Sequence, residues 1–438
     1  MTSTAERLVE LAGAALGGPV PLPVRAWDGS RSGPTPDPAG PVLVVNSRRA
    51  LRRLVWSPNE IGLAEAYLSG DIDIDGDLTE GLAALWSAAR AGEVGKPKLG
   101  PRQIARMVPA LARLGALGGR PPGPGQAAAL SGRRHSRERD RAAIAHHYDL
   151  SNDFYELLLD PSMAYSSAYY QDGPGGSLAD AQTAKLDLIC RKLGLHEGAR
   201  HLDIGCGWGS LICHAAEHYG TRSTGITLSR QQFDHVSKRV ARAGLADRVD
   251  VRHADYRELR AIEPGPLEGI GAPGDFDAVS TVEMGEHVGD DEYPAFARII
   301  FDMLRPCGRA LVQQMSRGAV APGGGGFIET YIAPDMHMKP VGTTVGLLAD
   351  AGLEVRDVHA LREHYTWTIR DWLRTFEGRI DEVTDLIGHV GARVWRLYLV
   401  GSALAFEQNR MGVDQILAVR PALDGDAGFA PSRKGWEL

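Results

Sequence analysis

Three glycines at alternate positions follow a short apolar strand near the middle of the chain and constrain the fold more than any other feature. The run reads His201-Leu-Asp-Ile-Gly205-Cys-Gly207-Trp-Gly209, and a helical pattern begins at about Ser210. Glycine lets the backbone turn tightly and approach a ligand closely, and the helix start leaves free N–H groups at the turn. The run therefore predicts a strand–turn–helix unit that binds a ligand, with a turn that binds nothing as the alternative.

The chain from residue 142 onward alternates between the apolar spacing of strands and that of helices. This pattern predicts an α/β fold with an open, mostly parallel sheet and helices on both faces. Ligands of such sheets lie at the carboxyl ends of the strands, and residues 323–340 are expected to cover that edge as a lid. The predicted strands are 200–204, 222–227, 248–252, 276–281, 308–315 and 413–419, and the predicted helices are 142–159, 178–194, 209–219, 229–243, 291–304, 367–387 and 388–408.

The pattern of short helices and strands over residues 1–92 predicts a smaller α+β domain. Asp71, Asp73, Asp75 and Asp77 follow a strand-like alternation and lack the terminal glutamate of an EF-hand, so no metal site is expected there. The predicted helices are 5–16, 49–55 and 61–68, and the predicted strands are 42–45 and 70–76.

Residues 93–141 form a linker rich in glycine and proline. Eleven lysines and arginines, against two acids, lie between Lys96 and Arg141. Apolar residues within 103–117 recur at helical spacing between arginines. This favours either a basic amphipathic helix on anionic lipid or a linker helix that packs on a domain. The larger domain is expected at 142–422, followed by a tail at 423–438.

Charge and cysteine content exclude several classes of protein. The net charge of −7 argues against a general nucleic-acid binder, so no nucleic-acid partner is expected. Four scattered cysteines, without metal or disulfide spacing, fit a cytoplasmic protein. No run of eighteen apolar residues is present, so no membrane span is expected.

Polar residues follow the predicted strands where a ligand is expected. The strand 222–227 continues into Leu228 and Ser229 without an acidic residue for a ribose. Thr227, Ser229 and Gln232 are the polar candidates there, although Ser229 also fits a helix N-cap. Asp255 and Tyr256 follow the next strand and are expected to flank an adenine.

Two further groups of residues suggest chemistry. One precedes the first strand of the sheet and is dense in aromatic and hydrogen-bonding side chains, over 145–155 and 163–170. The other is Val282-Glu283-Met284-Gly285-Glu286-His287-Val288-Gly289, which follows the fourth strand. Two carboxylates and a histidine within five positions favour a site over a capped, solvated helix start.

Together these motifs resemble the cyclopropane-fatty-acid synthase family, whose members use S-adenosylmethionine (SAM) to modify double bonds of acyl chains, mostly on phospholipids. The resemblance covers about 140–420, and residues 41–90 resemble the small lipid-binding domain of longer members. The motifs are His147-Tyr-Asp-Leu-Ser-Asn-Asp-Phe-Tyr, Tyr165-Ser-Ser-Ala-Tyr, Leu202-Asp-Ile-Gly-Cys-Gly-Trp-Gly, Gly225-Ile-Thr-Leu-Ser, Glu283-Met-Gly-Glu-His-Val-Gly and Phe327-Ile-Glu-Thr-Tyr-Ile.

The resemblance implies a SAM-methyltransferase fold, a phospholipid membrane surface as partner and an unsaturated acyl chain as substrate. It implies a protein at the inner face of the membrane, and a homodimer is compatible with it. Glu286 and Tyr365 match residues that border the reacting centre. The residues implied for the SAM site are Tyr165, Ser166, Asp203, Gly205, Gly207, Gly209, Thr227, Leu228, Gln232, Asp255 and Tyr256.

The chain departs from the family at the reacting centre. Cyclopropane synthases hold a bicarbonate, which serves as their base, with a cysteine, a histidine and an aliphatic residue whose positions here are Ser167, Gln313 and Met315. A phenylalanine of the family is Gly285, which is expected to open the pocket. These changes put the bicarbonate and ring closure in doubt.

Without ring closure, the cation left on the lipid can undergo a hydride shift and lose a proton from the new methyl group. The product is then a methylene branch, which some actinobacterial relatives make and a flavin-dependent reductase partner later reduces. We favour this product over cyclopropane, with Glu286 as the candidate base and Glu283 and His337 as reserves. A methyltransferase for a soluble molecule and a non-catalytic lipid-binding protein are the competing interpretations.

Overall fold

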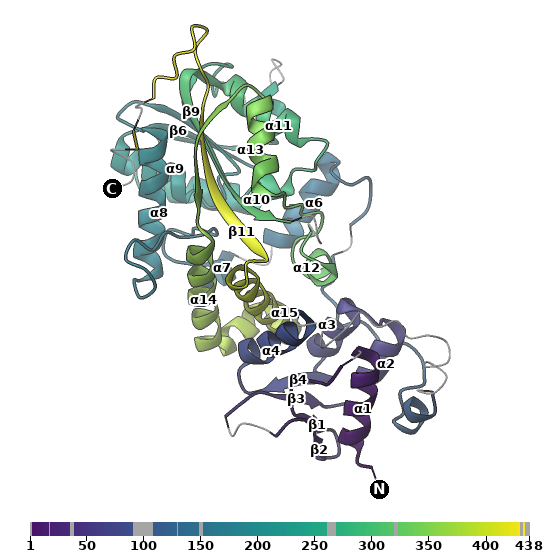
Figure 1. Ribbon diagram of the computed structural model, residues 1–438. Helices are drawn as coiled ribbons and strands as arrows, with labels where there is room; N and C mark the ends of the chain where they lie inside the picture. The colour runs from purple at the N-terminus through teal and green to yellow at the C-terminus, as the bar shows by residue number, and fades with distance from the viewer. Residues whose placement is uncertain are drawn as a thin grey trace. The chain divides into compact units, whose positions relative to one another are not determined.

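The computed structural model describes residues 2–16, 18–35, 39–90, 108–128, 130–148, 152–260, 269–318, 323–429 and 432–433. The chain divides into two compact units (Figure 1). The first comprises Met1–Ala127 with Gly388–Leu404, and the second Ala128–Ile387 with Ala405–Leu438. Residues 93–141, treated above as one linker, are thus shared between the two units.

The first unit is built on a four-stranded sheet in the order β2 (Arg31–Ser32), β1 (Val24–Ala26), β3 (Val42–Val45) and β4 (Ile72–Asp75). Helices α1 (Thr4–Leu16), α2 (Arg49–Trp56), α3 (Glu60–Leu68) and α4 (Leu78–Arg90) accompany it. The sequence predicts α1, α2, α3, β3 and β4. It misses α4, β1 and β2. The two strands hold three and two residues and are too short to show an alternation.

The aspartates around β4 are held by arginines of the same unit. The buried Asp71 accepts from Arg49 and Arg53 at 3.0 and 2.9 Å. Arg393 lies 3.0 Å from Asp73. A carboxylate paired in this way contributes to the internal structure of the unit rather than facing a free ligand.

The described part of the predicted linker helix packs on the first unit. Residues 108–113 are helical, whereas 91–107 lie outside the described residues. Leu114 is buried, and the carbonyl of Gly115 accepts from Arg52 of α2 at 3.0 Å. This packing agrees with the interpretation of this segment as a linker helix that packs on a domain.

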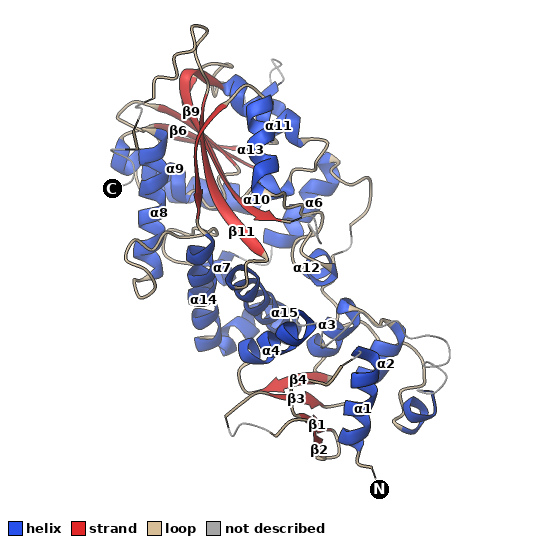
Figure 2. Ribbon diagram, in the orientation of Figure 1, coloured by secondary structure: helices blue, strands red, loops and turns tan. Residues whose placement is uncertain are grey.

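The second unit contains a seven-stranded sheet with helices on both faces. Its strands, in sheet order, are β10 (Glu354–Ala360), β11 (Met411–Val419), β9 (Leu304–Arg317), β8 (Phe276–Val282), β5 (Arg200–Ile204), β6 (Arg222–Thr227) and β7 (Val249–His253). Only pairs that include β11 are antiparallel among these strands. Figure 2 shows α8 and α9 on one side of this sheet and α11 and α13 on the other. The α/β prediction is confirmed.

The helices of this unit correspond to the predicted ones with some differences. They are α6 (Arg137–Tyr148), α7 (Asn152–Leu158), α8 (Leu178–Leu193), α9 (Ser210–Tyr219), α10 (Arg230–Arg242), α11 (Tyr293–Met303), α12 (Gly326–Tyr331), α13 (Val341–Asp350), α14 (Arg362–Gly378) and α15 (Ile380–Glu407). The single helix predicted over 142–159 is described as α6 and α7. Within α15, Gly388 has a φ of 74°, so the predicted boundary between two helices is a kink there.

Three elements of the second unit, α12, α13 and β10, are missing from the prediction, and α12 lies in the segment that was predicted only as a lid. In α13, two glycines and two threonines lower the helix propensity. In β10 the burial follows no alternation, so the pattern of a half-buried strand is absent.

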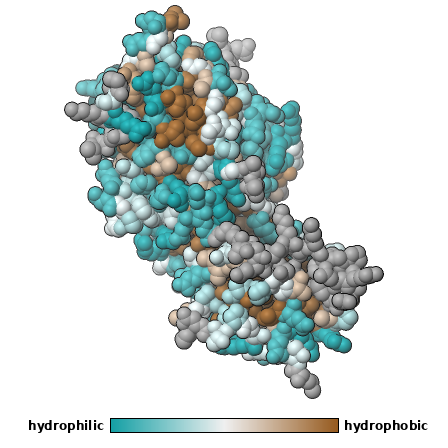
Figure 3. Space-filling model, in the orientation of Figure 1, coloured by the Kyte–Doolittle hydropathy of each residue, from teal (hydrophilic) through white to brown (hydrophobic). Residues whose placement is uncertain are grey.

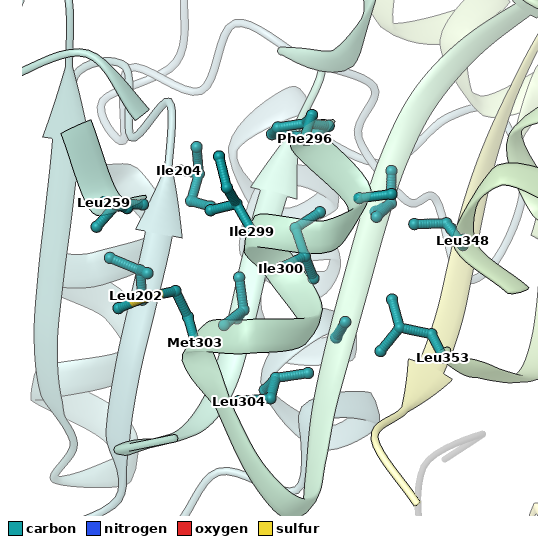
Figure 4. Close-up of a cluster of buried hydrophobic side chains, with 14 of the residues drawn as sticks. Leu202, Ile204, Leu259, Phe296, Ile299, Ile300, Met303, Leu304, Leu348 and Leu353 are labelled. Carbon is teal, nitrogen blue, oxygen red and sulfur yellow. The ribbon is translucent and has the colours of Figure 1, made fainter. Parts of the chain in front are cut away.

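The core of the second unit lies between the sheet and its helices. Leu202 and Ile204 of β5 pack against Phe296, Ile299 and Met303 of α11 (Figure 4). The outer surface seen in Figure 3 is mostly hydrophilic, with hydrophobic residues in small patches. Among the described residues, no helix has the length and apolar character needed to cross a bilayer.

Candidate active site

A pocket lies in the second unit at the carboxyl ends of the central strands. Its walls come from the glycine turn after β5, from the ends of β6, β7 and β8, and from the segment before α8. The lining residues include Met163, Tyr165, Ser166, Lys185, Asp203, Gly205, Gly207, Trp208, Thr227, Leu228, Gln232, Tyr256, Arg257, Glu283, Met284 and His287. Of the residues predicted for the cofactor, Gly209 and Asp255 are not among them.

The glycine turn has the left-handed backbone that its sequence predicts. Gly205, Gly207 and Gly209 have φ values of 86°, 54° and 81°. A Cβ atom on Gly205 would lie 2.7 Å from Cγ of Met284, and one on Gly209 would lie 2.7 Å from Val236. Apart from the chain neighbours of Gly207, no atom of the described residues lies within 4 Å of a Cβ placed there. Two glycines thus allow close packing, and the third leaves the pocket open.

Asp203 lies on the pocket wall at the end of a buried hydrogen-bond chain. Ser280 donates to its Oδ1 at 2.6 Å, and Nε2 of His201 lies 2.8 Å from the same hydroxyl. Burial raises the pKa of Asp203 to about 6 and lowers that of His201 to about 4. A neutral histidine therefore donates to Ser280 and keeps that hydroxyl directed at the carboxylate.

Lys185 of α8 is a pocket residue that sequence reasoning missed. Its Nζ donates to Oγ of Ser166 at 2.8 Å. Burial lowers the pKa of Lys185 to about 8, against the attraction of Glu283, Asp160 and Asp203. The sequence feature that could have indicated it is the position of Lys185 among the apolar residues on the buried face of α8.

The residues after β6 combine structural and pocket roles. Thr227 donates to Oε1 of Gln232 at 2.8 Å, and both line the pocket with Leu228. Ser229 caps α10 by accepting from the backbone N–H of Gln232 at 3.2 Å. The N-cap interpretation of Ser229 is confirmed.

After β7, Tyr256 lines the pocket whereas Asp255 does not. The carboxylate of Asp255 is buried and accepts from Arg257 at 2.8 and 2.6 Å. Arg257, which also lines the pocket, donates to Asp140 of α6 at 3.0 Å. Asp140 and Arg257 were missed because their pairing joins segments far apart in the sequence.

Four of the five predicted catalytic residues meet at Glu283. The backbone N–H of Ser167 and Nε2 of Gln313 donate to its Oε1 at 2.8 and 2.9 Å, and the hydroxyl of Tyr365 donates to Oε2 at 2.6 Å. Gln415 donates to Oε1 of Gln313 at 2.9 Å, which orients that amide. Burial raises the pKa of Glu283 despite these donors.

Glu286, the fifth, is fully buried and is not among the lining residues. Its Oε1 accepts from the N–H of Met315 at 2.5 Å, and its Oε2 has no hydrogen-bond partner among the described residues. Burial and the charge of Glu283 raise the pKa of Glu286 to about 8. His337, a reserve base, lies 3.1 Å from Asp290.

The expectation that Gly285 opens the pocket is wrong. A Cβ atom placed there would lie 2.2 Å from Oε1 of Gln314. Tyr293 donates to that oxygen at 2.6 Å. The amide of Gln314 therefore takes up the space beside Gly285.

Aromatic side chains pack against one another beside the pocket. Tyr165 and Trp208 belong to its wall, and the ring centroid of Tyr155 lies 5.5 and 4.6 Å from theirs. Trp208 donates to Asn152 at 3.1 Å. The side chains of 144–151, which include the first half of the His147 motif, lie outside the described residues. Electron-rich ring faces beside a pocket favour a cationic ligand.

A sheet of this order with a glycine turn and an aromatic pocket at its carboxyl edge is that of a SAM-dependent methyltransferase. Residues 135–416 match the family model of mycolic acid cyclopropane synthetase, and the chain belongs to that family. The predictions of family, enzyme class and cofactor are confirmed.

Similar proteins are named as methyltransferases of fatty acids. The chain is 33% identical to a probable fatty acid methyltransferase of Pseudomonas putida over 93% of each protein. It is 31% identical to the tuberculostearic acid methyltransferase UfaA1 of Mycobacterium tuberculosis, over 92% of this chain and 88% of that protein.

Solved structures of methyltransferases and cyclopropane synthases share the fold of the second unit. The cyclopropane synthase MmaA2 from Mycobacterium tuberculosis has a TM-score of 0.57 and 27% identity, covering 64% of this chain and 97% of its own. Coclaurine N-methyltransferase has a TM-score of 0.60 at 18% identity, over 81% of this chain and 98% of its own, and shares the fold alone.

Proposed function

We propose that the chain transfers a methyl group from SAM to the double bond of an oleoyl-like phospholipid chain and releases a methylene-branched chain. A cyclopropane is the alternative product. The names of the similar fatty acid methyltransferases support the acyl substrate. The observation that carries the proposal is the convergence of Ser167, Gln313 and Tyr365 on the carboxylate of Glu283 beside the cofactor pocket.

The pocket fits a sulfonium cofactor. Asp203 supplies a buried carboxylate for an ammonium group, and the open space at Gly207 admits a close approach of backbone and ligand. Tyr165 and Trp208 supply aromatic faces for a cation. Thr227, Gln232 and Tyr256 are proposed to hold the nucleoside portion.

When bound, SAM supplies an electrophilic methyl group, which takes the π electrons of the alkene while the carbon–sulfur pair stays on sulfur. The alkene is left as a carbocation on the acyl chain. The residues of this chain must then exclude water, stabilise the positive charge with carboxylates and ring faces, and remove a proton. The two products diverge at this carbocation. Proton removal with ring closure gives a cyclopropane, whereas a hydride shift followed by proton removal gives a methylene branch.

A membrane surface is the proposed source of the substrate. Exposed apolar side chains gather on α2, α3 and the segment after residue 107 of the first unit: Val55, Trp56, Leu63, Val108 and Leu117. Arg52 and Arg113 lie in the same segments. Apolar and basic side chains together favour a peripheral contact with anionic phospholipid. Weak co-sedimentation with anionic vesicles would instead favour a soluble substrate.

The function is tested by incubating the purified chain with oleoyl phospholipid vesicles and methyl-labelled SAM. Both candidate products gain the same mass, so the chains are also treated with ozone, which cleaves a methylene branch to a ketone and leaves a cyclopropane intact. A deuterium on the alkene carbon should migrate if the hydride shift occurs. An ozone-resistant product would establish the cyclopropane alternative, and no labelled lipid would remove the proposal.

A methylene-branched product is itself an alkene. A reductase that delivers a hydride and a proton would convert it to a methyl branch, and this class of enzyme is the proposed partner reaction. Calorimetric binding of SAM without any turnover would favour the non-catalytic lipid-binding interpretation.

A further inference from the structure

We propose that Glu283 is the base of the reaction, so that the protein supplies from its own chain the anion that removes the proton. This inference rests on the proposed function and deepens it. It assigns the role to Glu283 in place of Glu286, the first sequence candidate.

The surroundings of Glu283 form a receptor for a carboxylate. Its donors come from three separate parts of the fold: Ser167 precedes α8, Gln313 lies in β9 and Tyr365 in α14. Together they engage both carboxylate oxygens. Hydrogen bonds to an ionised group are about twice as strong as hydrogen bonds between neutral groups. The donors therefore favour the anionic form of Glu283 against the burial that raises its pKa, and they form a site for one small O–C–O group that the Glu283 carboxylate fills.

The backbone of Glu283 supports a functional placement. Its φ is 53°, a left-handed conformation that costs a non-glycine residue energy and recurs at active sites. The N–H of Glu283 donates to the carbonyl of Gln313 at 2.7 Å, and the adjoining Met284 packs against Gly205. This conformation places the carboxylate on the wall that also holds the glycine turn.

The other titratable groups nearby are less suited to the role. Glu286 is not among the lining residues, and its raised pKa keeps it protonated at neutral pH. Burial lowers the pKa of His287 to about 4, which makes it a weak base. Lys185 is a cation that attracts Glu283 and balances its charge between turnovers.

The proposed step balances in atoms and charge. A hydride moves with its electron pair from the methyl-bearing carbon to the neighbouring cationic carbon. Glu283 then takes a proton from the methyl group, and the C–H electron pair becomes the carbon–carbon double bond of the methylene branch. Glu283 is left as a neutral carboxylic acid, which releases its proton to water before the next cycle.

The test replaces Glu283 by glycine and by glutamine. Glycine accepts the backbone conformation at position 283 without strain, and it leaves the three donors facing an empty space. We expect Glu283→Gly to lose about 10²–10⁴-fold in methylene product, the usual contribution of a general base. Formate or bicarbonate at high millimolar concentration should raise the activity of this variant at least about tenfold.

Glu283→Gln keeps the size of the side chain and should lose as much activity, but it should gain nothing from added anion because the amide fills the receptor. Glu286→Gln distinguishes the two carboxylates and is expected to lose less than about tenfold. Calorimetric binding of S-adenosylhomocysteine to each variant, within about threefold of the wild type, shows that the fold and cofactor site are intact.

The outcomes separate this inference from the proposed function. If the wild type makes no methylated lipid, the proposed function fails. If the wild type does, the base assignment is overturned by a Glu283→Gly variant that works at the wild-type rate without added anion. It is also overturned by a loss that neither anion restores, or by a larger loss in Glu286→Gln than in Glu283→Gln.

Discussion

Replacing Tyr365 by phenylalanine removes the shortest hydrogen bond to Glu283 and keeps the aromatic packing. The phenolic oxygen lies 2.6 Å from Oε2, and the ring packs on Phe406 and Trp372 at centroid distances of 4.6 and 6.1 Å. A hydrogen bond to a charged group contributes about 1.5–3 kcal/mol. Because one pKa unit corresponds to about 1.4 kcal/mol, the pKa of Glu283 should rise by about 1–2 units.

The acidic limb of the pH dependence of kcat/KM reports the pKa of an essential base in the free enzyme. We expect this limb to move to higher pH by the same amount in Tyr365→Phe. The charge of Lys185 of α8 acts on Glu283, and the charge of Glu283 in turn raises the pKa of the neighbouring Glu286. Neither is altered in the variant, so a shift would belong to the lost hydroxyl.

The assay measures transfer of labelled methyl from SAM to oleoyl phospholipid vesicles across the pH range. Tyr170→Phe is the matched control, because Tyr170 donates to Asp371 at 2.7 Å and neither residue is among those lining the pocket. The control should leave the acidic limb in place. An unmoved limb in Tyr365→Phe, with normal binding of S-adenosylhomocysteine, would refute Glu283 as the titrating base.

Three further outcomes follow from the buried charges and the glycine turn. The pKa of Glu286 is raised to about 8 in the native state, so between about pH 4.5 and 8 the native state holds a proton that the unfolded state releases. The stability of the native protein therefore falls as the pH rises through this range. Melting curves of Glu286→Gln should show a smaller loss of stability over the same range. Lys185→Met should lower the free energy of unfolding by about 1–3 kcal/mol, measured in denaturant, because Ser166 loses its donor and Asp203 and Glu283 lose their shared cation. Gly205→Ala should destabilise the fold by about 2–4 kcal/mol through strain and the clash with Met284, whereas Gly198→Ala, at a φ of 78° with nothing within 4 Å, should cost about 1–2 kcal/mol in denaturant unfolding.

The sequence predicts the fold well wherever an element repeats its apolar spacing over enough residues. The strands β5, β6 and β8 and the helices α8 to α11 are of this kind. It fails for β1 and β2, where the elements are too short, and for β10, where burial follows no alternation. These elements depend on their neighbours in space, which local spacing does not contain.

The same limit applies to the site. The glycine turn, Thr227 and Tyr256 could be placed because each lies at the end of a strand or just after it, at the edge where ligands bind. Arg257 could not, because its partner Asp140 lies more than a hundred residues away in the chain. Glu283 and Glu286 are separated by only two residues, and the left-handed turn at Glu283 decides which carboxylate reaches the pocket.

A carboxylate beside a carbocation can also add to it and form an ester, which would inactivate the enzyme. The donors to Glu283 oppose this outcome, because each hydrogen bond withdraws electron density from the oxygen that would attack. They also hold both oxygens in place from three separate parts of the fold, so an oxygen cannot advance to bonding distance without breaking a buried hydrogen bond. Removing one donor should therefore do more than shift a pKa. In Tyr365→Phe we expect a slow loss of activity during turnover, with an acyl chain bound to Glu283 that intact-protein mass spectrometry would detect and that Glu283→Gln would lack.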